Sequence, residues 1–388
     1  MKLDSRAVHA GREPRAGESL PPPIVQASVY VYEDLDDYEA VASGRKPGHV
    51  YGRYSGENVA ALEAAVAALE GSEGAMGAAS GMSAQFATVL AIAPRPGPVV
   101  VAADAYGTTL SLLNQDLASL GYQVREVDVQ DPEALAGQLK GAALMLCETI
   151  SNPLCRVCDL EAIARLCRDG GVLLLVDNTF ASPILCRPLE LGATGVLHSV
   201  SKYIGGHSDL IAGMLAGPRD LVEQARGVMT RTGGSLGPFE AWLALRGLRT
   251  LHLRMARHSE NGLRLATGLA GLKGVAAVHH PLLPGSPSRA VASRLLPDGS
   301  GGMFAFDLEG GRPAVQAMLS RFRLVRFAAS LAGVETTISY PEITSHRSLS
   351  AEQRLALGIT PGTVRVSAGL EHPDDLLEDF RQALAGPA

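Results

Sequence analysis

The sequence predicts an α/β protein in which a mainly parallel sheet is covered by helices on both faces. Three observations predict this class. Over residues 59–250, short apolar runs alternate with amphipathic helical patterns. Over residues 251–388, strand and helix patterns follow in a mixed order, which indicates a smaller α+β domain. Residues 1–58 are rich in proline, glycine and charge and are expected to form an extended arm.

Composition restricts the class of protein. The 388 residues are 46% hydrophobic, which is enough for a large core. The formal net charge of -6 gives no basic surface for nucleic acid. No run approaches the roughly 18 apolar residues of a membrane-spanning helix, and the first residues lack the apolar core of a secretory signal. We expect no nucleic-acid partner, no membrane association and a cytoplasmic location.

The five cysteines do not predict a disulfide framework. Cys155 and Cys158 have CxxC spacing, but no second pair completes the four ligands of a structural zinc site. Cys167 falls on the apolar stripe of an expected helix. We therefore expect the cysteines to be core residues and expect no metal.

The arm is expected to lie on another subunit. Pro21-Pro22-Pro23 keeps the backbone extended, and residues 43–56 are rich in glycine and charge and include Tyr51-Gly52-Arg53. An arm with little core of its own needs a surface to lie on, and a neighbouring subunit is the natural one.

Helical patterns begin after the arm. Apolar residues at spacings of three and four predict a helix from about Asn58 to Leu69. A second helix is expected to begin at Ser80-Gly81-Met82, because serine is a favourable N-cap. The free N–H groups at such a helix start attract anions, phosphate included.

Apolar strands then alternate with helices. Strands are expected at 98–103, 122–129, 142–150, 171–176 and 195–197, with helices at 132–139 and 159–168 between them. In parallel sheets of this kind, the ligand lies at the carboxyl ends of the strands. Five polar or aromatic residues fall at or just beyond these ends: Tyr106, Glu148, Asn152, Asp177 and Lys202.

Lys202 is the residue around which the sequence predicts a site. It is one of five lysines and follows an apolar run, between Ser199-Val200-Ser201 and the pair Gly205-Gly206. Burial lowers the pKa of an ammonium group and makes the amine available as a nucleophile. The alternative is a lysine that extends from a strand end with its charge in water.

The C-terminal part is expected to begin after a long helical region from Pro238 to about Leu269. Strands are then expected at 275–280, 303–308, 324–327 and 364–367, with helices at 313–320 and 374–384. Arg365 lies inside an apolar strand, where a buried guanidinium needs a partner. A ligand carboxylate fits this role as well as Glu371 or Asp307.

Together these residues fit the chemistry of pyridoxal 5'-phosphate (PLP). Lys202 has an amine for its carbonyl group, and Asp177 has a carboxylate for its pyridinium nitrogen. Tyr106 has a flat face to stack on the ring, and the hydroxyls and the helix start suit the phosphate.

Two stretches resemble the cystathionine family of trans-sulfuration enzymes, the PLP-dependent enzymes of Cys/Met metabolism. They are residues 176–180 (VDNTF) and 199–209 (SVSKYIGGHSD). Supporting matches follow in family order at 51–53, 80–82, 106–107, 148–153, 330–336 and 364–371. The resemblance implies the type I fold of PLP-dependent transferases, with a seven-stranded sheet, and a homotetramer that acts on amino-acid substrates.

The resemblance also implies residue roles. Lys202 would bind the cofactor and move protons, Asp177 would pair with the ring nitrogen, and Tyr106 would stack on the ring and act as acid or base. The phosphate ligands would be Gly81, Met82, Ser199 and Ser201, with Tyr51 and Arg53 from a neighbouring subunit. Arg365, Asn152 and Thr336 would bind the substrate α-carboxylate, and Glu335 would lie with them.

The implied reaction is γ-elimination or γ-replacement on sulfur amino acids, of the cystathionine γ-synthase or γ-lyase type. Glu335 resembles these enzymes more than the β-lyases. Cystathionine-handling relatives often carry an arginine where this chain has Ser111, so an arginine for a distal carboxylate is missing at that position. Arg231 either replaces it or is a solvated charge. Methionine γ-lyases usually carry cysteine at the position of Thr108.

Other functions stay open at this point. Within the family, the alternatives are a cystathionine β-lyase, an O-acetylhomoserine sulfhydrylase and a methionine γ-lyase. Transamination and a PLP-binding protein without turnover are further alternatives. A nucleotide-binding enzyme is disfavoured because the sequence has neither a G-x-x-x-x-G-K loop nor a G-x-G-x-x-G turn.

Overall fold

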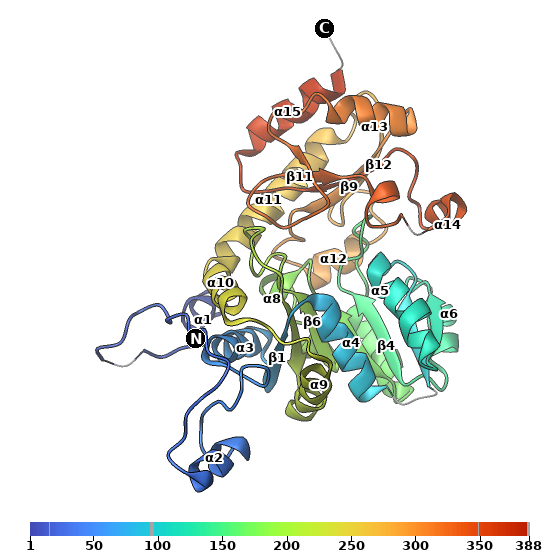
Figure 1. The fold of residues 1–388 in the computed structure, drawn as a ribbon. Helices are drawn as coiled ribbons and strands as arrows, with labels where there is room; N and C mark the ends of the chain where they lie inside the picture. The colour runs from blue at the N-terminus through green and yellow to red at the C-terminus, as the bar shows by residue number, and fades with distance from the viewer. Residues whose placement is uncertain (15, 94–96, 348, 386–388) are drawn as a thin grey trace.

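The computed structural model describes residues 1–14, 16–93, 97–347 and 349–385, and Figure 1 shows its two sheets. The larger sheet has seven strands in the order β1-β7-β6-β5-β4-β2-β3. The strands are β1 (Gly74–Ala78), β2 (Pro98–Ala102), β3 (Gln123–Val127), β4 (Leu144–Glu148), β5 (Leu173–Asp177), β6 (Gly195–Ser199) and β7 (Gly213–Gly217). Only β7 runs antiparallel to its neighbours. The predicted mainly parallel sheet is confirmed.

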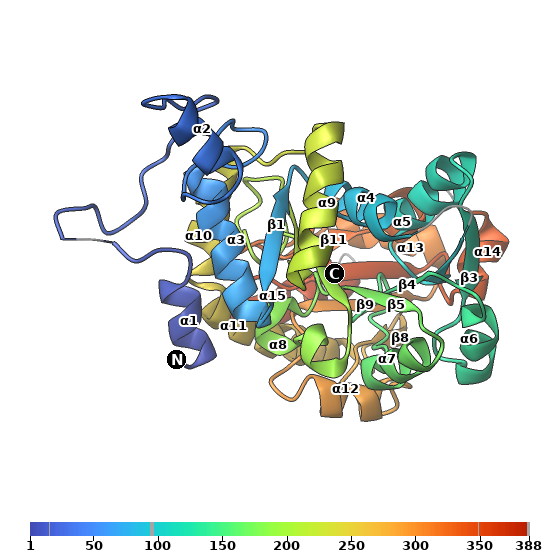
Figure 2. The same cartoon turned by 90° about the horizontal axis from the view of Figure 1, so that it is seen from below.

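Helices cover both faces of this sheet (Figure 2). They are α3 (Glu57–Glu70), α4 (Gly81–Ile92), α5 (Gly107–Ser111), α6 (Pro132–Leu139), α7 (Leu160–Asp169), α8 (Ser182–Leu185) and α9 (Arg219–Thr232). Crossovers between parallel strands are right-handed, so connections that run in opposite directions along the sheet lie on opposite faces. Accordingly, α4 and α9 lie on one face and α7 on the other. All five residues of β4 are buried, as expected for a strand covered on both sides.

The N-terminal region differs from the expected arm over residues 1–58. Helix α1 (Leu3–His9) packs on the main domain, where Ala7 is fully buried and the Arg6 guanidinium donates to the Ala68 carbonyl (3.0 Å). The segment that extends away from the body follows α1 and carries the short helix α2 (Leu35–Ala42), as Figures 1 and 2 show.

The expected long helix after residue 238 is two helices, α10 (Pro238–Leu248) and α11 (Leu251–Leu269). Arg254 explains the break. Its guanidinium donates to the Gly247 carbonyl at the end of α10 (2.6 Å) and to the Tyr203 carbonyl (2.6 Å). Through these hydrogen bonds, Arg254 ties both helices to the loop that carries Lys202.

The C-terminal domain has a five-stranded sheet in the order β10-β11-β12-β9-β8. Its strands are β8 (Val275–His279), β9 (Met303–Leu308), β10 (Arg326–Phe327), β11 (Thr337–Ser339) and β12 (Thr363–Ser367), and its helices are α12 (Arg289–Leu295), α13 (Gly311–Leu319), α14 (Ala351–Ala356) and α15 (Pro373–Ala385). Residues 386–388 of the expected domain lie outside the described residues. The five-stranded sheet with its helices confirms the expected smaller α+β domain. Strand β10 is shorter than the expected 324–327 because the Asp379 carboxylate accepts the backbone N–H groups of Leu324 and Val325.

Among the described residues, no helix is both long enough and apolar enough to cross a membrane. All five cysteines are free and buried.

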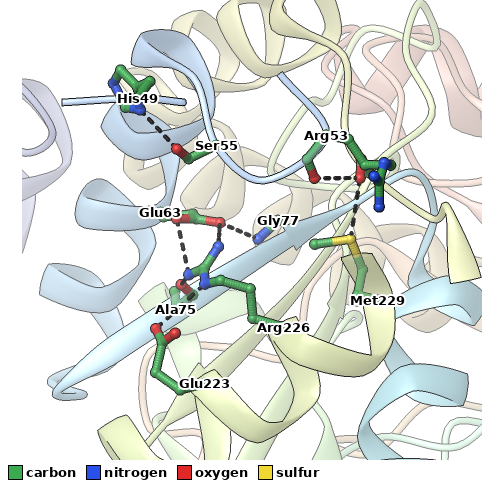
Figure 3. Close-up of polar contacts among 10 residues, drawn as sticks. His49, Arg53, Ser55, Glu63, Ala75, Gly77, Glu223, Arg226 and Met229 are labelled. Atoms are coloured by element: carbon green, nitrogen blue, oxygen red, sulfur yellow. Dashed lines mark hydrogen bonds and ion pairs between the residues drawn. The ribbon is translucent and has the colours of Figure 1, made fainter. Parts of the chain in front are cut away.

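Arg226 joins three elements of the main domain (Figure 3). From α9 it donates to Glu63 of α3 (2.9 Å) and to the Ala75 carbonyl of β1 (2.8 Å). Glu63 also accepts the Gly77 N–H of β1 (2.7 Å). Both side chains are mostly buried, at 20% and 13% exposure, so the loss of one partner leaves the other poorly solvated.

We therefore expect Arg226→Ala to lower the free energy of unfolding by about 2 kcal/mol, measured by urea denaturation. Arg257→Ala is the matched control, because its ion pair with Glu260 is exposed. That variant is expected to lose less than about 0.5 kcal/mol. Equal effects of the two substitutions would show that burial of the Arg226–Glu63 pair has no energetic consequence.

Candidate active site

The carboxyl ends of the parallel strands open into a pocket of about 610 Å³. Glu148 ends β4, Asp177 ends β5 and Ser199 ends β6, and Tyr106 precedes α5. All four line the pocket together with Lys202 and Asn152. The C-terminal domain closes the other side with residues that include Ala329, Leu331 and Arg365. The five residues predicted at the strand ends are therefore brought together.

A turn after β6 positions Lys202. Its backbone N–H donates to the Ser199 carbonyl (3.0 Å), and its carbonyl accepts the Gly206 N–H (2.7 Å). The Ser201 hydroxyl donates to the Ala212 carbonyl and accepts the Ala212 N–H (3.2 and 3.0 Å). Burial lowers the pKa of Lys202, and the nearby Arg365 charge lowers it further. Both effects favour the free amine.

Asp177 and Glu148 form a pair of acids beneath the pocket, because the register of β4 and β5 sets them side by side. Burial raises the pKa of Asp177, against a stabilising hydrogen bond from the Thr179 N–H (2.9 Å). The pKa of Glu148 is raised well above its usual value by burial and by the Asp177 charge. A cation beside Asp177 would restore its carboxylate form, as a protonated ring nitrogen does.

Glu148 also positions Tyr106. The carboxylate oxygen Oε1 of Glu148 accepts the Tyr106 backbone N–H (2.6 Å) at the start of α5. Tyr106 lines the pocket and is 39% exposed as a residue, so part of it is open to a ligand there.

An anion cradle lies where α4 begins. The Ser80 hydroxyl accepts the Ser83 N–H (3.1 Å), and the amides of Gly81 and Met82 belong to the first turn, where a helix has no internal acceptor. A Cβ at position 81 would lie only 3.2 Å from the Cα of Ser199, so glycine lets the helix start approach the end of β6. Amine, acid, aromatic face and cradle together fit PLP.

Arg365 of β12 is 5% exposed and forms no ion pair with any described residue. Its guanidinium donates to Asn152 Oδ1 (3.0 Å) and to the Ser330 carbonyl (3.1 Å). Its buried Nε has no hydrogen-bond partner among the described residues. Burial lowers the pKa of Arg365 to about 10, which still leaves it charged at neutral pH.

The two protein carboxylates considered as partners for Arg365 are engaged elsewhere. Glu371 accepts the Thr336 N–H (2.6 Å) and hydroxyl (2.8 Å). Asp307 bonds to His279 (2.7 Å) and Thr360 (3.1 Å). A ligand carboxylate is therefore the partner that the geometry favours for Arg365.

Two expected substrate-binding residues lie outside the pocket. Thr336 is fully buried and accepts the Gly369 N–H (2.9 Å) while donating to Glu371, so it stabilises the loop before β11. Glu335 is exposed and does not line the pocket. The role of Thr336 in binding the substrate carboxylate stays a prediction; in this structure its hydroxyl bonds to Glu371 and to the Gly369 N–H.

Tyr51 and Arg53 also lie outside the pocket of their own chain. Arg53 donates to the Thr230 carbonyl (2.7 Å), and its own carbonyl accepts the Ser235 hydroxyl (2.7 Å). Figure 3 shows Arg53 at this place, beside Met229. Tyr51 is 40% exposed and stacks near the Arg53 guanidinium, 5.6 Å from the ring centre.

Sequence reasoning missed one wall of the pocket, formed by residues 343–345 and Arg347. Thr108 and Ser111 of α5 line the same pocket. The only sequence feature of the segment is a polar run, Thr344-Ser345-His346-Arg347, after a proline turn.

Comparison with known proteins agrees with this site. The sequence matches the family described as Cys/Met metabolism PLP-dependent enzyme over residues 4–385. The chain belongs to this family. It is 37% identical to the L-methionine gamma-lyase of Pseudomonas putida, over 99% of this chain and 97% of that protein. It is 38% identical to the O-succinylhomoserine sulfhydrylase of Pseudomonas aeruginosa, over 99% and 95%.

Solved structures show the same likeness. The cystathionine gamma synthase of Xanthomonas oryzae pv. oryzae, in complex with aminoacrylate and cysteine, superposes with a TM-score of 0.93 at 37% identity, covering 99% of this chain and 98% of that one. A protein from Campylobacter jejuni that carries N'-pyridoxyl-lysine-5'-monophosphate superposes with a TM-score of 0.94 at 27% identity, covering 100% of both chains. This member of the family is thus a PLP-dependent enzyme that acts on amino acids.

We expect Arg365→Lys to lower kcat/KM for an amino-acid substrate by about 100-fold, since lysine keeps the charge but loses the planar fork that matches a carboxylate. Steady-state kinetics measures the change. The control is Arg381→Lys on α15, which is exposed and outside the pocket. An unchanged kcat/KM in a folded, cofactor-loaded Arg365→Lys enzyme would exclude Arg365 as the carboxylate ligand.

Proposed function

We propose that this enzyme catalyses γ-elimination or γ-replacement on sulfur amino acids, as a cystathionine γ-synthase or γ-lyase. The supporting observation is that Lys202 and Arg365 line one pocket. The amine of Lys202 has a lowered pKa. The buried guanidinium of Arg365 bonds to Asn152 and to no protein carboxylate among the described residues. The amine can move protons and the guanidinium can orient an α-amino acid.

The pocket and the resemblance to the family support the roles proposed here. When bound, PLP acts as an electron sink for carbanions next to the amino group. The Lys202 amine removes the Cα proton, and burial, which lowers its pKa, favours the uncharged form that can accept the proton. Asp177 would bind the ring nitrogen, and the start of α4 with Ser199 would bind the phosphate. Ser201 is a further proposed phosphate ligand, whose hydroxyl bonds to Ala212 in this structure. Tyr106 would stack on the ring and donate a proton to the leaving γ-substituent.

Arg365 and Asn152 act as one carboxylate-binding unit in this proposal. Their mutual hydrogen bond fixes the guanidinium plane, so a carboxylate that binds it is held in one orientation. Lys202, the proposed proton acceptor, lines the same pocket as this pair.

Lys202→Ala is expected to abolish the visible absorbance of the bound cofactor and to lower turnover by more than about 10³-fold, since the amine both binds the cofactor and moves protons. Absorbance spectra and a coupled oxoacid assay measure both effects. A Lys202→Ala enzyme with normal turnover would disprove the proposed function.

Product analysis separates the reaction types. We expect the enzyme to form cysteine, 2-oxobutyrate and ammonia from L-cystathionine, or cystathionine from an O-acyl-homoserine and cysteine. Homocysteine with pyruvate would identify a β-lyase instead. Homocysteine from sulfide would identify a sulfhydrylase, and methanethiol from methionine would identify a methionine γ-lyase.

We also propose that the arm completes the site of a neighbouring subunit in a homotetramer. Several apolar side chains of the arm are exposed in the single chain. The exposed fractions are 78% for Leu20, 67% for Val29, 96% for Val31 and 87% for Leu35. Such side chains on an extended segment favour a covering partner. In the assembly, Tyr51 and Arg53 would reach the phosphate at the α4 start of the next chain.

Mixing two inactive variants tests this proposal. Arg53→Ala retains Lys202, and Lys202→Ala retains Arg53, so a mixed dimer contains one complete site only if the arm crosses between chains. When equal amounts are refolded together, random pairing makes about half of the dimers mixed, and each mixed dimer has one complete site of its two. We therefore expect about a quarter of the wild-type activity. No activity above that of the separate variants would show that the arm serves its own chain.

For location, we propose the cytoplasm, where thiols stay reduced, because all five cysteines are free and buried. Cell fractionation checks this.

A further inference from the structure

Arg347 lies on the wall of the pocket that the sequence did not reveal. It follows a short turn, Pro341–Ile343, in the segment before α14. The Ser345 carbonyl lies so close to Gly107 that a Cβ at position 107 would overlap its oxygen. This contact sets the segment directly against α5, which carries Thr108 and Ser111. Arg347, Thr108 and Ser111 all line the pocket.

The backbone before Arg347 is fixed by a buried neighbour. His346 is 1% exposed, and its N–H donates to the Pro341 carbonyl (2.9 Å). Its Nδ1 bonds to the Ser345 hydroxyl (2.9 Å). Burial lowers the pKa of His346 to about 4, with further lowering by Arg365 and Arg354. The imidazole is therefore neutral at neutral pH, and Arg347 provides the positive charge of this wall.

The charged residues around the pocket indicate that Arg347 does not neutralise an acidic group of the protein. The described residues that line the pocket include three basic side chains, Lys202, Arg365 and Arg347. They also include two acidic side chains, Glu148 and Asp177. The acids lie side by side at the strand ends, at the proposed cofactor site. No described residue forms a hydrogen bond or an ion pair with the Arg347 side chain, which is exposed.

Resting on the proposed function, we propose that Arg347 binds a second, distal carboxylate of the substrate. The substrate class is then an α-amino acid whose γ-substituent ends in a carboxylate, as in O-succinyl-L-homoserine. Arg365 binds the α-carboxylate, and Arg347 binds the carboxylate at the far end. Ser111, which lines the same pocket, has a short side chain that leaves room for the substrate. Arg231, the other candidate for this role, does not line the pocket.

Two substrates that differ at the distal end test the proposal. O-succinyl-L-homoserine has a terminal carboxylate and O-acetyl-L-homoserine has none, and each is assayed with cysteine as the thiol. For Arg347→Ala, we expect kcat/KM with the succinyl substrate to fall roughly 10-fold, mainly through KM, because the pair is partly solvated. With the acetyl substrate, we expect a change of less than about two-fold.

Three further variants sharpen the result. Arg347→Lys keeps the charge and is expected to retain most of the preference for the succinyl substrate. Arg381→Ala, on the exposed side of α15, is the matched control and is expected to change neither substrate. Arg231→Ala tests the competing arginine. An equal effect of Arg347→Ala on both substrates, no effect on either, or a selective loss in Arg231→Ala instead would overturn the proposal.

A binding measurement keeps this inference separate from the proposed function. In the cofactor-loaded enzyme, stopped-flow absorbance of the bound cofactor, read before turnover, compares the affinity for the two acyl-homoserines with and without Arg347→Ala. A selective loss of affinity for the succinyl compound supports the distal site even if the wild-type enzyme processes neither compound, which would refute only the proposed function. If Arg347→Ala leaves the affinity for the succinyl compound unchanged, the distal site itself is overturned.

Discussion

Burial of charged side chains at the carboxyl edge of the seven-stranded sheet is the constraint on which the site depends. Lys202, Asp177 and Glu148 lose water there, and each has its pKa shifted toward the neutral form. A protein can retain such groups only where a ligand compensates them or where neighbouring backbone groups do. The site is thus electrostatically incomplete without a ligand, which is the state expected of a preorganised catalytic centre.

The contacts that surround this edge serve to hold it in place. Arg254 ties the loop after Lys202 to the junction of α10 and α11 through three backbone carbonyls. Asn152 and the Ser330 carbonyl hold the guanidinium of Arg365 from the two domains. The catalytic groups are therefore carried by turns whose geometry depends on packing at some distance from the chemistry.

The sheet, its helices and the strand-end residues could be predicted because apolar periodicity is local and parallel strands share a carboxyl edge. Features that depend on tertiary contacts could not. The extent of β10 depends on Asp379, and the split between α10 and α11 depends on Arg254. The bond between Thr336 and Glu371 likewise leaves no local trace in the sequence. The wall with Arg347 was missed because only folding brings Ser345 against Gly107.

The contact between Gly107 and Ser345 joins the two domains at the rim of the pocket. The chemical steps use the floor, which belongs to the large sheet, whereas the rim combines α5 with a segment of the smaller domain. Under the proposed function, the groups that would bind the cofactor and move the Cα proton lie on the floor, whereas Arg347, which would select the substrate, lies on the rim. An exchange of Arg347 could then change the range of substrates without altering the floor.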